Sequence, residues 1–229
     1  MASRKEQKER LRQERMQREQ EAAAAAARRK RMGYGVAGVL VAAVVIAVAA
    51  IALAGGGSSS TGTSDSGWPS GSIPKRKETD LVAAAKAAGC VLQHPAMEGR
   101  THVTGHVNYK TAPPTSGPHN PVWAHDGAYR SNPPGVEHLV HPLEHGRVIY
   151  WFKPNAPLRV IGDLKKLYDE DHALVILTPY VRPMPYQVAA TAWTELLGCP
   201  AYNDRVPDAF RAFRDQFRLK GPEYVPNAE

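Results

Sequence analysis

The chain has 229 residues, 43% of them hydrophobic, and a formal net charge of +7. Residues 1–31 hold 11 Lys and Arg against five Asp and Glu, so the rest of the chain carries a net charge of only +1. The high isoelectric point therefore gives no support for nucleic-acid binding by a folded part of the chain, and no nucleic-acid partner is expected.

The N-terminal quarter of the chain divides into a charged tail and an apolar run. Residues 1–31 are rich in helix formers but lack an apolar stripe, which predicts a solvated, cytoplasmic helical tail. Residues 32–54 are predicted to be a transmembrane helix, because Gly33 to Ala54 carries no charge over 22 positions and can cross a hydrocarbon layer of roughly 30 Å. A signal peptide cleaved after the Ala-x-Ala pattern at its end is the alternative.

The basic residues that precede this run place the N-terminus in the cytoplasm and the remainder outside the cell membrane. Residues 55–74 are predicted to be a flexible Gly/Ser-rich linker, and residues 75–229 an extracytoplasmic domain. Cys90 and Cys199 are expected to form a disulfide there, because the outer compartment is oxidising. Two unpaired thiols, or one thiol that binds copper, are the alternatives.

The pattern of the outer region predicts an α+β fold with about four strands and three helices. Thr79 or Asp80 can cap the first helix, and Gly89 can end it. In the last helix, Phe210, Phe213 and Phe217 recur at helical spacing and are assigned to the core. The predicted helices cover 81–89, 158–170 and 207–221, and the predicted strands cover 102–109, 147–152, 172–180 and 186–197.

A proline-rich segment, residues 111–146, interrupts this pattern. Its seven prolines and four glycines exclude a long helix or a central strand, so a long ordered loop is predicted. Loops of this length in compact domains are usually functional or disordered, and the aromatic and histidine content argues against disorder.

Eight of the nine histidines lie between His94 and His145. Imidazole is a common ligand of transition metals, and an irregular loop can fold distant histidines toward one point. We therefore expect a bound transition-metal ion, copper first and zinc second, for storage, sensing or delivery, and no organic cofactor. Met97 and Met184 slightly favour copper, because thioethers bind its reduced form. The candidate ligands are His119, His125, His138, His141 and His145.

The run from Thr101 to Tyr150 contains PPTSGPHNPVWA and LVHPLEHG, and it resembles the DUF3105 family of membrane-anchored bacterial proteins, which is common in actinobacteria. The resemblance covers about residues 75–220. It implies the architecture and the membrane location, but no reaction and no catalytic residue.

Two other readings stay open. His141, Glu144 and His145 fit the H-x-x-E-H pattern of zinc metallohydrolases, in which the glutamate activates water, although Pro142 and Gly146 leave room for a single helical turn at best. Alternatively, the histidines hold the loop by donating to backbone carbonyls in a metal-free domain that interacts with an envelope protein. His102 and His106 are interpreted as structural strand residues that cannot easily share one ion, because four residues of strand separate them by roughly 13 Å.

Overall fold

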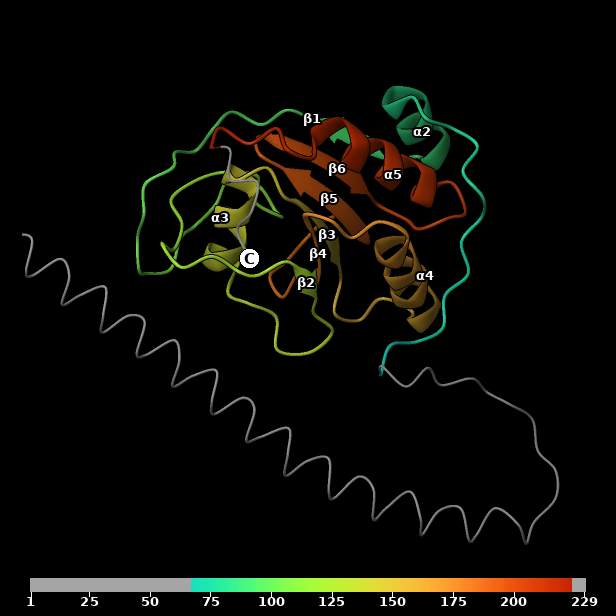
Figure 1. The fold of residues 1–229 in the computed structure, drawn as a ribbon, viewed down its shortest axis with the longest axis horizontal. Coiled ribbons are helices and arrows are strands. Elements are labelled where there is room, and N and C mark those ends of the chain that lie inside the picture. Colours follow the sequence, from blue (N-terminus) through green and yellow to red (C-terminus); the bar gives the residue numbers. More distant parts are fainter. Residues whose placement is uncertain (1–66, 224–229) are drawn as a thin grey trace, which may run out of the picture. The chain divides into compact units, whose positions relative to one another are not determined.

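The computed structural model describes residues 67–223, and this part of the chain folds into a six-stranded sheet with four helices (Figure 1). The α+β class predicted from the sequence is therefore confirmed. The helices are α2 (Leu81–Ala88), α3 (Val136–Glu144), α4 (Leu158–Glu170) and α5 (Val206–Phe217). The strands are β1 (Val91–Gln93), β2 (Gly127–Ala128), β3 (Val148–Phe152), β4 (Val175–Pro179), β5 (Val188–Ala192) and β6 (Glu195–Cys199).

The sheet is mixed, and its strand order is β1-β6-β5-β3-β4-β2. β3 and β4 are parallel and are joined through α4, as a parallel pair requires a crossover connection. β5 and β6 form an antiparallel hairpin, and β5 adds antiparallel to β3. The longer strands, β3, β4, β5 and β6, thus lie in the middle of the sheet, while the short strands β1 and β2 form its edges.

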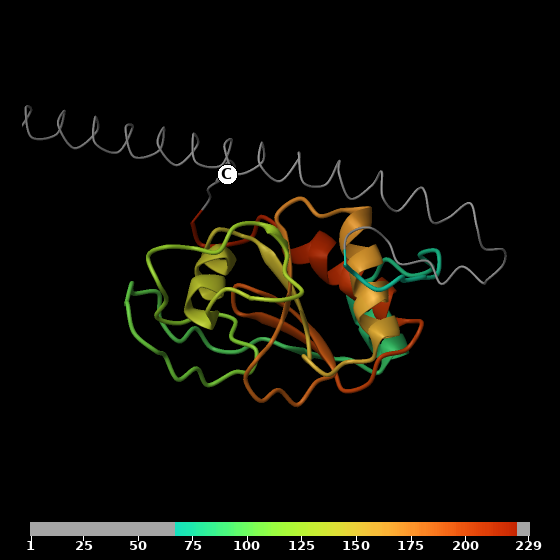
Figure 2. The same cartoon turned by 90° about the horizontal axis from the view of Figure 1, so that it is seen from below.

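Each face of the sheet has its own hydrophobic core. Tyr150 and Phe152 of β3 pack with α2, α4 and α5, whereas Ile149 and Trp151 pack with α3 on the opposite face (Figure 2). Successive side chains of a strand point to opposite faces, so burial of both sets explains why this strand is apolar throughout. The three helices predicted from the sequence therefore cover one face, and the proline-rich segment covers the other.

The predicted numbers of strands and helices are too low. The sequence predicts one strand over 186–197, but the chain reverses at Trp193 and Thr194, where Thr194 has a φ of 61°, and forms both β5 and β6. The edge strands β1 and β2 are too short to give a periodic pattern. The fourth helix, α3, lies within the segment predicted to be a loop.

The local signals of the first helix are confirmed. Asp80 caps α2, because its carboxylate accepts a hydrogen bond of 2.8 Å from the Ala83 N–H. Gly89 ends the helix in the left-handed conformation, with a φ of 66°. Cys90, the next residue, forms the predicted disulfide with Cys199 and joins the start of β1 to the end of β6. Phe210 and Phe213 of α5 are fully buried, as predicted.

The folded region begins before the expected end of the linker. Trp68 and Ile73 pack against the core on the α4 face, and the Ser72 N–H donates to the Asp163 carboxylate. No helix within residues 67–223 is long and apolar enough to cross a membrane. The predicted span, residues 32–54, and the predicted tail lie outside the described residues.

Candidate metal centre

Helix α3 places four polar side chains on the proline-rich side of the sheet: His138, His141, Glu144 and His145. The helix runs through Pro142, so the expectation of a single turn at best is wrong. A proline inside a helix leaves the carbonyl four residues earlier without its usual donor. Here that carbonyl belongs to His138, and it accepts a hydrogen bond of 2.9 Å from the Ala124 N–H of the preceding loop.

The loop before α3 is fastened to the helix by several such bonds. The Asn120 N–H donates to the Glu137 carbonyl over 3.0 Å, while His138 and His141 donate their Nδ1–H groups to the carbonyls of Val122 and Asn120. A carbonyl oxygen only accepts, so these contacts fix the proton on Nδ1 of both rings. Loop and helix therefore position each other, and the loop is held against the face that carries His141.

A third segment reaches the same place through His102. Residues 102–109 do not form the predicted strand: His102 makes only an isolated parallel bridge to His119, and the Val107 N–H bonds the Glu137 carboxylate instead of a neighbouring strand. Around the bridge, the His119 N–H donates to the Thr101 carbonyl and the Val103 N–H to the His119 carbonyl. These two bonds hold His102 beside His119.

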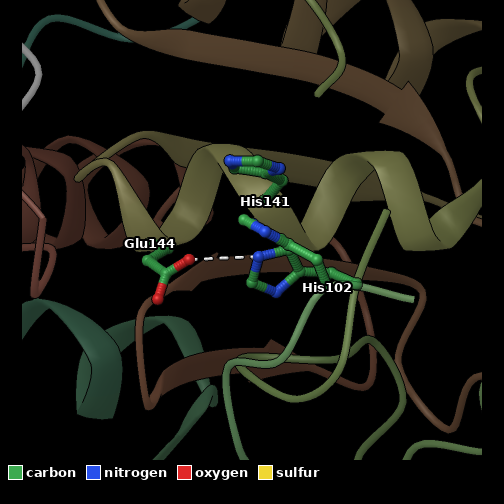
Figure 3. A group of neighbouring side chains, drawn as sticks. His102, His141 and Glu144 are labelled. Carbon is green, nitrogen blue, oxygen red and sulfur yellow. Dashed lines mark ion pairs between the residues drawn. The ribbon is translucent and has the colours of Figure 1, made fainter. Parts of the chain in front are cut away.

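Four side chains from these segments converge: His102, His119, His141 and Glu144. Each offers a ligand atom, and the four atoms all lie within 4.8 Å of one another. Figure 3 labels three of the four side chains, His102, His141 and Glu144. The ring centroids of the three histidines are 4.7 to 5.1 Å apart. Ligand atoms about 2 Å from one ion lie roughly 3 to 4 Å apart, so small side-chain rotations suffice to enclose a metal.

The interior of this group favours uncharged imidazoles. Burial lowers the pKa of both His119 and His141 below the ordinary value. The Nδ1–H of His119 points to the Gly117 carbonyl at 2.8 Å, just as that of His141 points to Asn120. Each ring then keeps a lone pair on Nε2. A neutral imidazole whose Nδ1–H is held by a carbonyl is the usual form of a histidine that binds metal through Nε2.

Glu144 completes the group from the last turn of α3. Its Oε2 lies 3.0 Å from Nε2 of His119, and burial followed by the charge of Glu223 raises the pKa of its carboxyl. Within residues 67–223, neither His119 Nε2 nor Glu144 Oε1 has a hydrogen-bond partner, although both are buried. Buried polar atoms without partners are rare, and both atoms carry a lone pair that a metal ion can accept.

A family model described as a protein of unknown function (DUF3105) matches residues 102–227, more than half of the chain. The chain belongs to the DUF3105 family. No curated protein and no solved structure matches it. The DUF3105 region begins at His102 and contains all four members of the candidate metal centre.

Within the DUF3105 region, the structure places the five predicted ligands differently. His119 and His141 belong to the group of four, and the His145 ring lies beside it, 4.8 Å from that of His141 and 4.7 Å from that of Trp123. His125 is exposed and His138 is half-buried, and both lie outside the group.

The sequence interpretation missed His102 as a candidate ligand. The spacing argument considers only His102 and His106 on a strand that does not form, and it does not test whether His102 meets a histidine from another segment. The only sequence signal is that His102 lies in the same histidine-rich run as His119. The methionines that favour copper contribute no donor to the group: Met97 is 57% exposed, and Met184 is buried in the core of the α3 face.

Proposed function

We propose that this DUF3105 protein binds a single divalent transition-metal ion between His102, His119, His141 and Glu144. The proposal rests on the observation that four side chains converge and that two of their buried atoms, His119 Nε2 and Glu144 Oε1, have no hydrogen-bond partner within residues 67–223. A metal ion is a partner for both kinds of atom, since it accepts lone pairs from nitrogen and oxygen.

The donor set narrows the choice of metal. Three imidazoles and one carboxylate contain no thiolate or thioether, which disfavours the reduced copper ion and favours a divalent one. Cu²⁺ is the first candidate, because it has the highest affinity for nitrogen and oxygen donors among the divalent first-row ions, and Zn²⁺ is the second. Storage, sensing and delivery of the ion are the functions that such a site serves on the outer side of a membrane.

The structure gives less support to the two alternative functions, a metallohydrolase and a metal-free domain. In the metallohydrolase reading, Glu144 stands apart from the ligands as a base, yet its Oε2 lies 3.0 Å from a candidate ligand nitrogen. The metal-free reading accounts for the Nδ1–H bonds of His119 and His141 to backbone carbonyls. It leaves the Nε2 lone pair of His119 and the Glu144 carboxylate facing each other in the interior.

The location belongs to the same proposal. The uncharged run Gly33 to Ala54 and the basic residues before it support a single membrane span with the N-terminus in the cytoplasm. The disulfide between Cys90 and Cys199 agrees with an outer, oxidising compartment. A metal ion, and an envelope protein that receives or supplies it, are the expected partners.

Metal analysis of the full-length chain tests the proposal. The protein is purified in detergent without a histidine tag, loaded with Cu²⁺ or Zn²⁺, and its metal content is measured by mass spectrometry. We expect close to a single ion per chain. His119→Ala and His141→Ala should each lower the affinity at least about tenfold, because each removes a buried ligand.

His125→Ala is the matched control, since His125 was a ligand candidate on sequence grounds but is exposed and outside the group. It should bind as the wild type does. A wild-type chain that takes up neither ion overturns the proposal. If His125→Ala loses the ion as fully as His119→Ala, the donor group is wrong.

A further inference from the structure

The four donors differ sharply in their access to solvent. His119, His141 and Glu144 are 0%, 5% and 2% exposed, whereas His102 is an exposed residue. A metal ion held by this group is therefore shielded on three sides by buried ligands. His102 is the one member of the group that an incoming molecule can reach directly.

His102 also differs in how its ring is held. The rings of His119 and His141 each donate to a carbonyl of the loop that is fastened to α3. Within residues 67–223, the His102 ring has contacts with the other two rings, at 5.1 and 4.9 Å between centroids, and no hydrogen bond. Ligands that are fixed by an outer hydrogen bond keep their orientation, and a ligand without one is easier to displace.

The chain on the C-terminal side of His102 is largely exposed. After the bridge to His119, it continues through Thr104, Gly105 and His106, which are all exposed. Gly105 has nothing within 4 Å of the position that a Cβ atom would occupy. An incoming molecule therefore meets an exposed stretch of chain next to His102.

We propose that His102 is the exchangeable ligand of the site, through which the metal ion enters and leaves. This inference rests on the proposed metal binding. In the exchange, the bond between the ion and the His102 nitrogen breaks as a bond to an outside nitrogen or oxygen donor forms. The oxidation state of the ion does not change, and His102 leaves as a neutral imidazole with its lone pair. The partner is an acceptor that presents such a donor at the His102 face.

Ligand exchange in the Cu²⁺-loaded, full-length chain tests this inference. The rate of Cu²⁺ release to excess EDTA is followed by stopped-flow absorbance for wild type and for His102→Ala. We expect His102→Ala to keep the ion but to release it at least about tenfold faster, because the displacement step is no longer needed. Free imidazole should restore the visible absorption band of the wild type and slow the release.

Two further variants make the result specific. His119→Ala removes a ligand whose side chain is fully buried, so imidazole should not rescue its binding. His106→Ala removes an exposed histidine outside the group and should release Cu²⁺ at the wild-type rate. The inference is overturned if His102→Ala releases the ion at the wild-type rate, or if imidazole rescues His119→Ala as well as it rescues His102→Ala. Absence of Cu²⁺ from the wild type would instead overturn the proposed function.

Discussion

The contact between His119 and Glu144 lies at the centre of the candidate metal site. Their facing atoms, Nε2 and Oε2, are 3.0 Å apart in a fully buried position. Because the Nδ1–H of His119 is directed to the Gly117 carbonyl, Nε2 presents a lone pair to a carboxylate. Two lone pairs at this distance repel each other unless a proton or a metal ion lies between them.

Replacing Glu144 by Gln separates these possibilities. The amide N–H₂ can donate to the Nε2 lone pair, and a buried hydrogen bond contributes about 1 kcal/mol. We therefore expect Glu144→Gln to raise the thermal midpoint of the metal-free chain at pH 7.5. The same change should weaken Cu²⁺ binding at least about tenfold, because it removes the only charged donor of the group.

A site that binds a cation should respond to Glu144→Gln with a higher thermal midpoint and a lower Cu²⁺ affinity. If His119 were instead a protonated partner in a structural ion pair, Glu144→Gln would remove a buried charge partner and lower the thermal midpoint. Asp204→Asn is a suitable control, because Asp204 is a surface carboxylate whose side chain is 72% exposed and lies outside the group, and a surface ion pair contributes little to stability. It should change neither quantity appreciably.

The end of α3 is held by the last described residues of the chain. The Leu219 N–H donates to the Gly146 carbonyl over 2.8 Å, and the Glu223 N–H donates to the Glu144 carbonyl over 3.1 Å. A Cβ atom on Gly221 would lie only 2.1 Å from the same Glu144 carbonyl oxygen, so this close approach requires glycine. The segment after α5 therefore supports the backbone of the residue that supplies the carboxylate.

The start of this segment is anchored by Arg218, whose guanidinium donates to the Asp171 carboxylate over 2.7 Å. That hydrogen bond holds the pKa of Asp171 below its ordinary value. A carboxyl whose pKa is depressed by folding stabilises the native state above its unfolded pKa of about 3.9, and this contribution is lost as the pH falls through the native pKa. Asp171→Asn should thus lower the thermal midpoint at pH 7.

The difference between wild type and Asp171→Asn should shrink as the pH falls from about 4 toward the lower native pKa of Asp171, because the unfolded chain takes up a proton in this range before the native carboxylate does. Thermal unfolding at pH 7, 4 and 3 measures it. A difference that stays constant over this range would show that Asp171 acts through packing and not through its charge.

The elements that the sequence predicts are those with a local signal. Helix α2 has its cap at Asp80 and its glycine stop, and α5 has phenylalanines at helical spacing, so both follow from neighbouring residues. Helix α3 does not, because the donor that replaces the missing N–H of Pro142 comes from Ala124, in a different part of the loop. A proline within a helix is predictable only if that tertiary bond is known.

At the scale of the whole molecule, the candidate site depends on contacts between segments that are distant in sequence. The candidate group lies within the histidine-rich run, and His119 and His141 lie close together in it. His102 could not be assigned, because its position depends on a bridge to His119, 17 residues later. Glu144 was considered only as the base of the metallohydrolase alternative, whereas it lies beside three imidazoles and is a ligand in the proposed site.

The disulfide and the candidate metal site lie on opposite faces of the sheet. The disulfide lies at the junction of β1 and β6, and Cys199 packs in the core beneath α2, α4 and α5. The histidines and Glu144 lie on the opposite side, with α3 and its loop. Stability lost on the first face should therefore leave the geometry of the metal donors intact, provided that the chain remains folded.

Removal of the disulfide tests this division. Cys90 and Cys199 are 109 residues apart, and closing a loop of that length stabilises the native state by about 4 to 5 kcal/mol in the chain-entropy model. We expect the Cys90→Ala, Cys199→Ala double variant to unfold at a clearly lower temperature and denaturant concentration. Its Cu²⁺ affinity, measured well below the unfolding transition, should stay within about threefold of the wild type, a change of roughly 0.7 kcal/mol. A tenfold loss of Cu²⁺ affinity in the folded double variant would contradict this expectation. It would show that the positions of the metal donors depend on the opposite face of the sheet, because a change at the β1–β6 edge would then reach α3 through the strands between them.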